Sequence, residues 1–208
     1  MLAQIIHYFQ TSSAEYWGYV GQHLFLSLIY LALPLGYLGS RNRVVAAFCQ
    51  MFSQLLRIIP SLALLFILIP FMGAGVVPAI IALVVLTLPP LVVNTILGFN
   101  EVSPVLKEVG LSLGMDQKQL LKQITLPLAL PYILNGIKLA LVEIISSPTL
   151  ATYIGAGGLG TLIFTGLGLY KMQFIIIGAV SVALLSLLSM LLMDWLIRKV
   201  KENDQNNY

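Results

Sequence analysis

The chain has 208 residues, of which 59% are hydrophobic and only 9% are charged, and its mean hydropathy is +0.95. Soluble domains carry about a quarter charged residues, so this composition excludes a water-soluble globule and predicts one all-α bundle in a lipid bilayer. The net charge of +3 gives no reason to expect a nucleic-acid partner. Cys49 is the single cysteine, which excludes an intrachain disulfide and a cysteine-based metal site.

Five apolar stretches approach the length of about 20 residues that a helix needs to cross the hydrocarbon core. They cover residues 20–39, 56–72, 76–98, 127–147 and 174–197. Residues 1–22 have neither a basic start nor a small-residue cleavage pattern, so we expect no removed signal peptide. We therefore predict one transmembrane domain over residues 1–208, in which the first span acts as its own insertion signal.

The stretch 44–55 is apolar but carries Gln50, Ser53 and Gln54. We expect it to lie along the membrane interface and to lead into the second span. Arg57 would then stand at the start of that span and reach the lipid headgroups, which avoids burying an unpaired guanidinium group.

Lys and Arg in the short loops predict the orientation, because basic residues are retained in the cytoplasm. Clusters follow the first, third and fifth spans, and they consist of Arg41 and Arg43, of Lys107, Lys118 and Lys122, and of Arg198, Lys199 and Lys201. All three lie on one side if the N terminus is outside and the C terminus is cytoplasmic. The opposite side then carries the turn 71–77 and the loop 148–173.

The segment 100–126, between the third and fourth spans, is the one sizeable polar insertion and lies on the positive side. Ser103 and Pro104 predict a helix start, Gly114 predicts its end, and Asp116 predicts the start of a second helix. Apolar residues recur at helical spacing in both helices, namely Leu106, Val109, Gly110 and Leu113, and then Leu120, Leu121 and Ile124. The segment therefore predicts two short amphipathic helices joined by a glycine turn.

This segment resembles the EAA-x3-G-x9-I-x-L-P loop of ABC importer permeases in every spacing. Val109 and Gly110 replace both alanines of the triplet. In that family the loop is the coupling helix, which docks into a groove on a cytoplasmic ATPase. The resemblance implies that role for Glu108, Gly110, Gly114, Ile124, Leu126 and Pro127. The alternative is an ordinary cytoplasmic loop whose apolar face lies on lipid headgroups.

Residues 154–160 fit the GxGxxG pattern of dinucleotide sites, but that pattern has meaning only between a strand and a helix. Here it lies between membrane spans, so we reject a nucleotide site. The stretch resembles instead the GAGGLG signature of permeases for osmoprotectants and for methionine. This resemblance places Gly155, Gly157, Gly158 and Gly160 near the external mouth and the docking site of a binding protein.

Further stretches resemble the betaine, carnitine and choline branch of these permeases, so that the likeness covers roughly residues 20–200. They are residues 59–65, 71–75, 77–83 and the pair Asn94-Thr95. The resemblance implies the type I ABC importer fold, a bacterial cell membrane location, and import of a small osmoprotectant such as glycine betaine, carnitine or choline. A methionine-type permease is the rival within this class. A secondary carrier independent of ATP is the rival outside it, although the sequence shows no inverted repeats.

The same resemblance implies the partners. Two ATP-binding cassette ATPase subunits would carry ATP and Mg²⁺, a second copy or a sister permease would complete the membrane unit, and a separate extracellular or periplasmic protein would deliver solute. We expect no cofactor on this chain. The sequence has no Ser/His/Asp set, paired catalytic carboxylates or phosphate loop, so we also expect no catalysis by the chain itself.

Ionisable residues inside a span are costly and therefore candidates for function. Lys138 and Glu143 lie five residues apart in the fourth span, about 140° apart around a helix, which makes a direct bridge doubtful. We expect Lys138 to reach a neighbouring helix or the interface, whereas Glu143 could face a wet pathway or a partner permease. Asn94, Thr95 and Asn135 are candidates for the translocation path or for interhelical hydrogen bonds.

Overall fold

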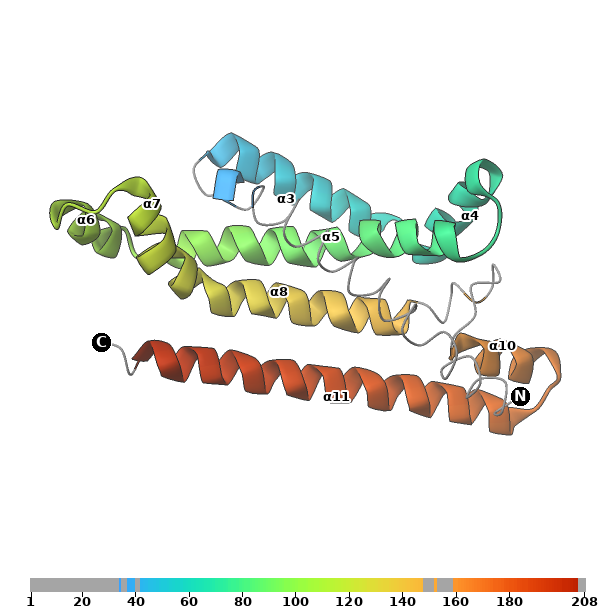
Figure 1. Ribbon diagram of the computed structural model, residues 1–208. Coiled ribbons are helices and arrows are strands. Elements are labelled where there is room, and N and C mark those ends of the chain that lie inside the picture. Colours follow the sequence, from blue (N-terminus) through green and yellow to red (C-terminus); the bar gives the residue numbers. More distant parts are fainter. Residues whose placement is uncertain (1–33, 35–36, 40–41, 148–151, 153–158, 206–208) are drawn as a thin grey trace.

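The computed structural model describes residues 34, 37–39, 42–147, 152 and 159–205. Regular structure in these residues is helical throughout (Figure 1). The long elements are α3 (Arg43–Ile58), α4 (Ser61–Met72), α5 (Val76–Glu101), α8 (Leu126–Ser146) and α11 (Met172–Gln205). The short ones are α6 (Pro104–Ser112), α7 (Gln117–Leu120), the π-helical turn η2 (Leu121–Thr125) and α10 (Gly160–Gly168).

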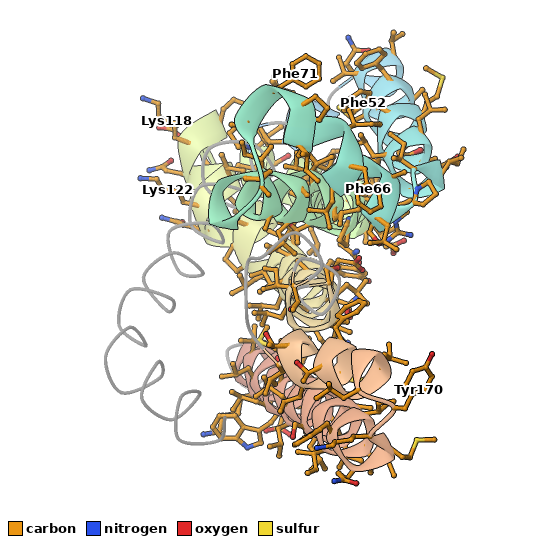
Figure 2. The ribbon with its side chains drawn as sticks, turned by 90° about the vertical axis from the view of Figure 1, so that its right-hand side faces the viewer. Phe52, Phe66, Phe71, Lys118, Lys122 and Tyr170 are labelled. Carbon is orange, nitrogen blue, oxygen red and sulfur yellow. The ribbon has the colours of Figure 1, made fainter. Side chains whose placement is uncertain are left out.

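The long helices form three layers (Figures 1 and 2). The antiparallel pair α5 and α8 lies in the middle, α3 and α4 cover one side of α5, and α11 packs against α8 with α10 beside it. The small helices α6 and α7 lie at one end of the bundle, and α4 and α10 lie at the other.

Small residues let α5 and α8 approach closely, as expected where helices pack within a membrane. A Cβ atom at Gly98 of α5 would lie 2.8 Å from Cβ of Tyr132 and 2.9 Å from the backbone oxygen of Ala129. A Cβ atom at Gly136 of α8 would lie 3.0 Å from the backbone oxygen of Pro90. Two glycines on opposite helices thus set the distance between the central pair.

The predictions for the third, fourth and fifth spans are confirmed, since residues 76–98, 127–147 and 174–197 correspond to α5, α8 and α11. By length and composition, three helices of the described part can cross a membrane, and they cover Ile81–Glu101, Gln117–Ser146 and Met172–Glu202. The predicted first span, residues 20–39, lies almost wholly outside the described residues. Tyr37, near its end, packs edge-on against Phe99 with ring centroids 5.6 Å apart.

The predictions for the second span and for the preceding interfacial stretch are wrong. Residues 44–58 do not lie flat along an interface, because Cys49 is buried against Leu91, Ile96 and Ala140 of the central helices. The predicted second span is interrupted, since α3 and α4 meet at an 88° bend at Pro60, and by length and composition the pair corresponds to a broken span or a re-entrant loop.

The polar residues of α3 explain the error. Gln50 and Gln54 are exposed on its outer face, which the sequence reading took for a face in contact with headgroups. Ser53 is instead buried. The amphipathic pattern therefore reports which face of a packed helix points outward and says nothing of its direction relative to the membrane.

The described residues of the three basic clusters gather at one end of the bundle, as predicted, and Arg41 lies outside the described residues. α3 begins at this end, α6 and α7 lie there, and α11 ends there (Figure 1). Figure 2 shows Lys118 and Lys122 projecting to the same side. Lys171 lies near the start of α11, at the opposite end.

Candidate functional site

An elbow of residues 104–125 joins α5 to α8, and its turn depends on one glycine. Gly114 has a φ of +85°, the left-handed region that glycine occupies without steric cost. The backbone N–H of Gly114 donates to Leu111 O at 3.0 Å and that of Met115 donates to Gly110 O at 3.1 Å, which closes the end of α6. Nothing lies within 4 Å of a Cβ placed on Gly114, so backbone conformation alone selects glycine there.

A capping box starts the second half of the elbow. The Asp116 carboxylate accepts from the backbone N–H groups of Lys118 and Gln119, each at 2.7 Å, and the Gln119 side chain accepts from the N–H of Asp116 at 2.9 Å. α7 then continues through η2 into α8 without a break. The elbow is therefore a rigid extension of α8.

Gly110 holds α6 against the rest of the elbow. It is buried, and a Cβ there would lie 2.8 Å from Leu120 Cδ1 and 2.9 Å from Ile124 Cδ1. The prediction that Leu120, Leu121 and Ile124 share an inward face is confirmed, since they are buried or half-buried. Of the four residues predicted at helical spacing in α6, Gly110 is buried against the elbow, whereas Leu106, Val109 and Leu113 are exposed.

Lys107 fastens the elbow to α5. Its ammonium group donates to the backbone oxygen of Phe99 at 3.3 Å, one of the last carbonyls of α5 that no helical N–H satisfies. Partial burial lowers the pKa of Lys107, because loss of solvent disfavours the charged form. The elbow is thus connected to both central helices, to α8 through η2 and to α5 through this contact.

The outer face of α6 is apolar and exposed. It carries Val105, Leu106, Val109, Leu111 and Leu113, of which Leu113 is 75% exposed. Glu108 is exposed among them. Of the other predicted coupling residues, Ile124 packs inside the elbow, while Leu126 and Pro127 begin α8. A rigid lever that presents an uncovered apolar face can transmit force from a partner that binds it.

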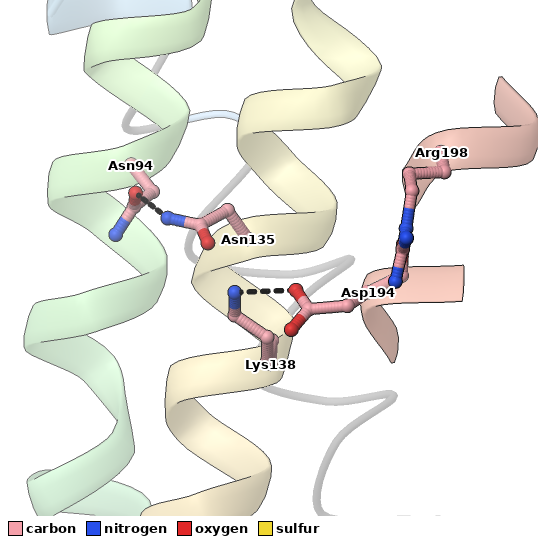
Figure 3. Close-up of polar contacts among 5 residues, drawn as sticks. All are labelled: Asn94, Asn135, Lys138, Asp194 and Arg198. Atoms are coloured by element: carbon pink, nitrogen blue, oxygen red, sulfur yellow. Dashed lines mark hydrogen bonds and ion pairs between the residues drawn. The ribbon is translucent and has the colours of Figure 1, made fainter. Parts of the chain in front are cut away.

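The candidate path residues Asn94 and Asn135 meet between α5 and α8 (Figure 3). Asn135 Nδ2 donates to Asn94 Oδ1 at 3.0 Å, and Asn94 Nδ2 donates to the backbone oxygen of Pro90 at 2.8 Å. Thr95 is buried, and its hydroxyl donates to Leu91 O at 2.7 Å. The contact between Asn94 and Asn135 is an interhelical hydrogen bond, which is one of the two roles expected for these residues. A role in the translocation path stays a prediction.

Lys138 forms an ion pair with Asp194 of α11, with its Nζ 2.8 Å from a carboxylate oxygen (Figure 3). The prediction that Lys138 reaches a neighbouring helix rather than Glu143 is confirmed. Asp194 was missed by the sequence analysis. The sequence feature that could have identified Asp194 is a carboxylate in an otherwise apolar span, because such a group requires a cationic partner.

Glu143 lines a pocket of about 500 Å³ at the break between α3 and α4. Arg57 lines the same pocket from the last turn of α3 and is exposed, and its predicted place at the membrane interface stays a prediction. Glu143 accepts a hydrogen bond from the hydroxyl of Ser147 at 3.2 Å. Within the described residues the one ion pair closer than 4.0 Å is that of Lys138 with Asp194, so Arg57 and Glu143 do not pair directly.

Only the last of the four predicted loop glycines is described. Gly160 begins α10 and is buried. Gly155, Gly157 and Gly158 lie outside the described residues, and their predicted place at an external mouth is untested. α10 lies at the end of the bundle opposite to the elbow (Figure 1).

Residues 31–202 match the family model described as "Binding-protein-dependent transport system inner membrane component". The chain belongs to this family. Its resemblance to osmoprotectant permeases is also confirmed by relatives over most of its length. The chain is 41% identical to the carnitine transport permease protein OpuCB of Listeria monocytogenes, over 88% of this chain and 87% of that protein. It is 34% identical to the osmoprotectant import permease protein OsmW of Salmonella typhimurium, over 94% of each.

Solved structures confirm the fold. An inward-facing structure of the MetNI methionine ABC transporter matches this permease with a TM-score of 0.75 at 24% identity, over 88% of this chain and 91% of that one. The all-α type I importer permease fold predicted from the sequence is therefore correct. The family also places the chain in the inner membrane as a transport component that works with other subunits.

Proposed function

We propose that this chain is the permease subunit of an ATP-driven importer and forms the translocation path for a small osmoprotectant such as glycine betaine, carnitine or choline. Relatives that carry these solutes in their names support the substrate class. One is named a glycine betaine/carnitine/choline transport system permease protein, OpuCB of Bacillus subtilis, and is 38% identical over 89% of this chain and 88% of that protein.

The observation that carries the proposal is the elbow with its exposed apolar face on α6. ATPase subunits bind this face, and they hold the ATP and Mg²⁺, while this chain binds no cofactor and hydrolyses nothing. Two permeases, either two copies or this chain and a sister, present two elbows to two ATPases. Exposed Val105, Leu106 and Val109 supply the apolar contacts, and Glu108 adds a charge at the rim.

The elbow supplies the coupling. It is continuous with α8 and tied to α5 by Lys107, so a displacement of α6 moves both central helices. ATP-driven closure of the ATPases favours one orientation of the two elbows, because a partner shifts an equilibrium only by its differential affinity for the two states. The membrane helices follow the favoured orientation.

The elbow and the basic clusters lie on the cytoplasmic side of a bacterial cell membrane, with the C terminus inside and the N terminus outside. α4, α10 and the loop 154–160 then lie on the external side, where a separate substrate-binding protein docks. Basic residues at the elbow end support this orientation.

Two rivals make different predictions. A methionine-type permease shares the elbow and the fold, and it would take up methionine in place of quaternary amines. A secondary carrier would transport with an ion gradient and no ATPase. Uptake of labelled glycine betaine, carnitine, choline and methionine by the assembled importer, with and without ATP, separates these possibilities.

The direct test of the coupling role adds charge to the apolar face. Leu106→Asp combined with Val109→Asp is expected to abolish co-purification of the ATPase and ATP-dependent uptake, while the permease stays folded in the membrane. Tyr170→Asp is the matched control for ATPase co-purification, since Tyr170 is 96% exposed at the opposite end of the bundle (Figure 2). Normal ATPase capture by the double variant would contradict the proposal.

A further inference from the structure

The pocket at the break between α3 and α4 brings two opposite charges together without an ion pair between them. Arg57 comes from the last turn of α3, and Glu143 comes from α8. Both line the same pocket, yet they are not within ion-pair distance. An ionisable residue in a membrane span is costly, and its presence indicates a partner or a function.

The pocket lies beside the break between α3 and α4, against the middle of α5 and the C-terminal half of α8. Pro89 and Pro90 form part of its wall, and they are close to the midpoint of α5, which runs from Val76 to Glu101. A pocket of about 500 Å³ is within the usual range for small-molecule sites, about 300–1,000 Å³. Broken helices at the middle of a membrane are a recurrent way to build solute sites, because they expose backbone groups inside the bundle.

The wall on the side of α5 offers an oxygen acceptor. Proline has no N–H, so Pro90 leaves the backbone oxygen of Leu86 without its helical donor. Leu86 itself lines the pocket. Together with the Glu143 carboxylate, this oxygen favours a cation.

The wall on the side of α3 and α4 favours an anion. Arg57, an exposed residue, lines this wall, and α4 starts there, after Pro60, with no side chain capping its first N–H groups. The positive end of that helix adds to the charge of Arg57. Apolar side chains such as Ile59, Leu139 and Val142 line the space between the two charges.

We propose that this pocket binds the permeating solute as a zwitterion, with Glu143 facing its ammonium group and Arg57 facing its carboxylate. The inference rests on the proposed function and adds that Arg57 favours solutes that carry a carboxylate besides the ammonium group. The apolar lining suits the methyl groups of a quaternary ammonium. Among the described residues no aromatic side chain lines this pocket, so carboxylate and carbonyl oxygens take the place of an aromatic cage.

The test compares two solutes that share a trimethylammonium group. Glycine betaine also has a carboxylate, whereas choline has a hydroxyl group in its place. Ligand-detected NMR on the purified permease–ATPase complex, without binding protein, reports binding to the membrane unit alone. Initial uptake rates of the complete importer in proteoliposomes, at saturating binding protein, report transport.

Glu143→Gln is expected to weaken binding and uptake of both solutes. Arg57→Gln is expected to weaken those of glycine betaine and to leave those of choline unchanged. Loss of a hydrogen bond to a charged group corresponds to about a tenfold or larger reduction in affinity for the solute. Glu143→Asp and Arg57→Lys keep the charges and should retain part of the activity.

Arg198→Gln and Glu202→Gln are matched controls, because both residues are exposed near the end of α11 and away from the pocket. ATPase capture and the Tm of each complex show that the variants fold. If Arg57→Gln loses binding and uptake of both solutes equally, Arg57 has a structural role and the zwitterion assignment is overturned. The assignment is also overturned if Glu143→Gln binds and transports both solutes as the control variants do. If the wild-type importer transports neither solute, the proposed substrate class fails first, so the two failures are distinguishable.

Discussion

The ammonium nitrogen of Lys138 lies 2.8 Å from a carboxylate oxygen of Asp194, and this ion pair joins α8 to α11. The two side chains are 15% and 34% exposed. It is a specific polar attachment of α11, whose apolar side chains are largely exposed. Arg198 adds a weaker contact, donating from Nε to the backbone oxygen of Asp194 at 3.4 Å.

Lys138→Met is therefore expected to destabilise the permease by about 2 kcal/mol, because it leaves the Asp194 carboxylate without its cation in a poorly hydrated place. The double variant Lys138→Met/Asp194→Leu should recover most of the loss, since apolar groups can replace both charges. Thermal unfolding of the detergent-solubilised complex measures both. If the loss of stability in the double variant equals the sum of the losses in Lys138→Met and Asp194→Leu, the two residues are not energetically coupled.

Gly114→Ala is expected to weaken the elbow through backbone strain. A φ of +85° costs an alanine roughly 1–2 kcal/mol relative to glycine. Gly114→Asn is the matched comparison, since asparagine tolerates left-handed backbone better than alanine does. ATPase capture should fall for Gly114→Ala and fall less for Gly114→Asn. Identical capture by wild type and Gly114→Ala would mean that the turn has another way to form.

Much of the elbow could be predicted from the sequence, because its signals are local. The helix start at Pro104, the glycine turn at Gly114 and the cap at Asp116 each act within four residues. The inward position of Gly110 was missed, since it depends on packing against Leu120 and Ile124.

The path of α3 and the pocket could not be predicted in the same way. Both depend on which helices lie side by side, and one sequence does not give those pairings. Arg57 and Glu143 are 86 positions apart in the chain, and Lys138 and Asp194 are 56 apart. A charged residue in an apolar span predicts that a partner exists, and only the packed bundle identifies it.

Asn135→Leu tests whether the polar pair between α5 and α8 acts in packing. Interhelical hydrogen bonds of this kind contribute about 0.6 kcal/mol on average, so the expected loss of stability is small. Uptake should stay near the wild-type rate if the side chains only join the two helices. A large loss of uptake at unchanged Tm would instead assign Asn94 and Asn135 to the translocation path.

A series of glycine variants tests the packing of the central helices. In Gly98→Ala the new methyl group would lie 2.8 Å from Tyr132 Cβ and 2.9 Å from the backbone oxygen of Ala129. Backbone atoms cannot rotate away, so α5 and α8 must separate, and overpacking of this kind costs about 1–3 kcal/mol.

Two other positions provide comparisons for Gly98→Ala. Gly110→Ala should cost less, because its closest contacts are Leu120 Cδ1 and Ile124 Cδ1, the ends of side chains that can change rotamer. Gly168→Ala has nothing within 4 Å and should be neutral or slightly stabilising. Unfolding temperatures of the three variants give the order. If Gly98→Ala and Gly168→Ala unfold alike, the close approach of α5 and α8 at Gly98 does not limit their packing.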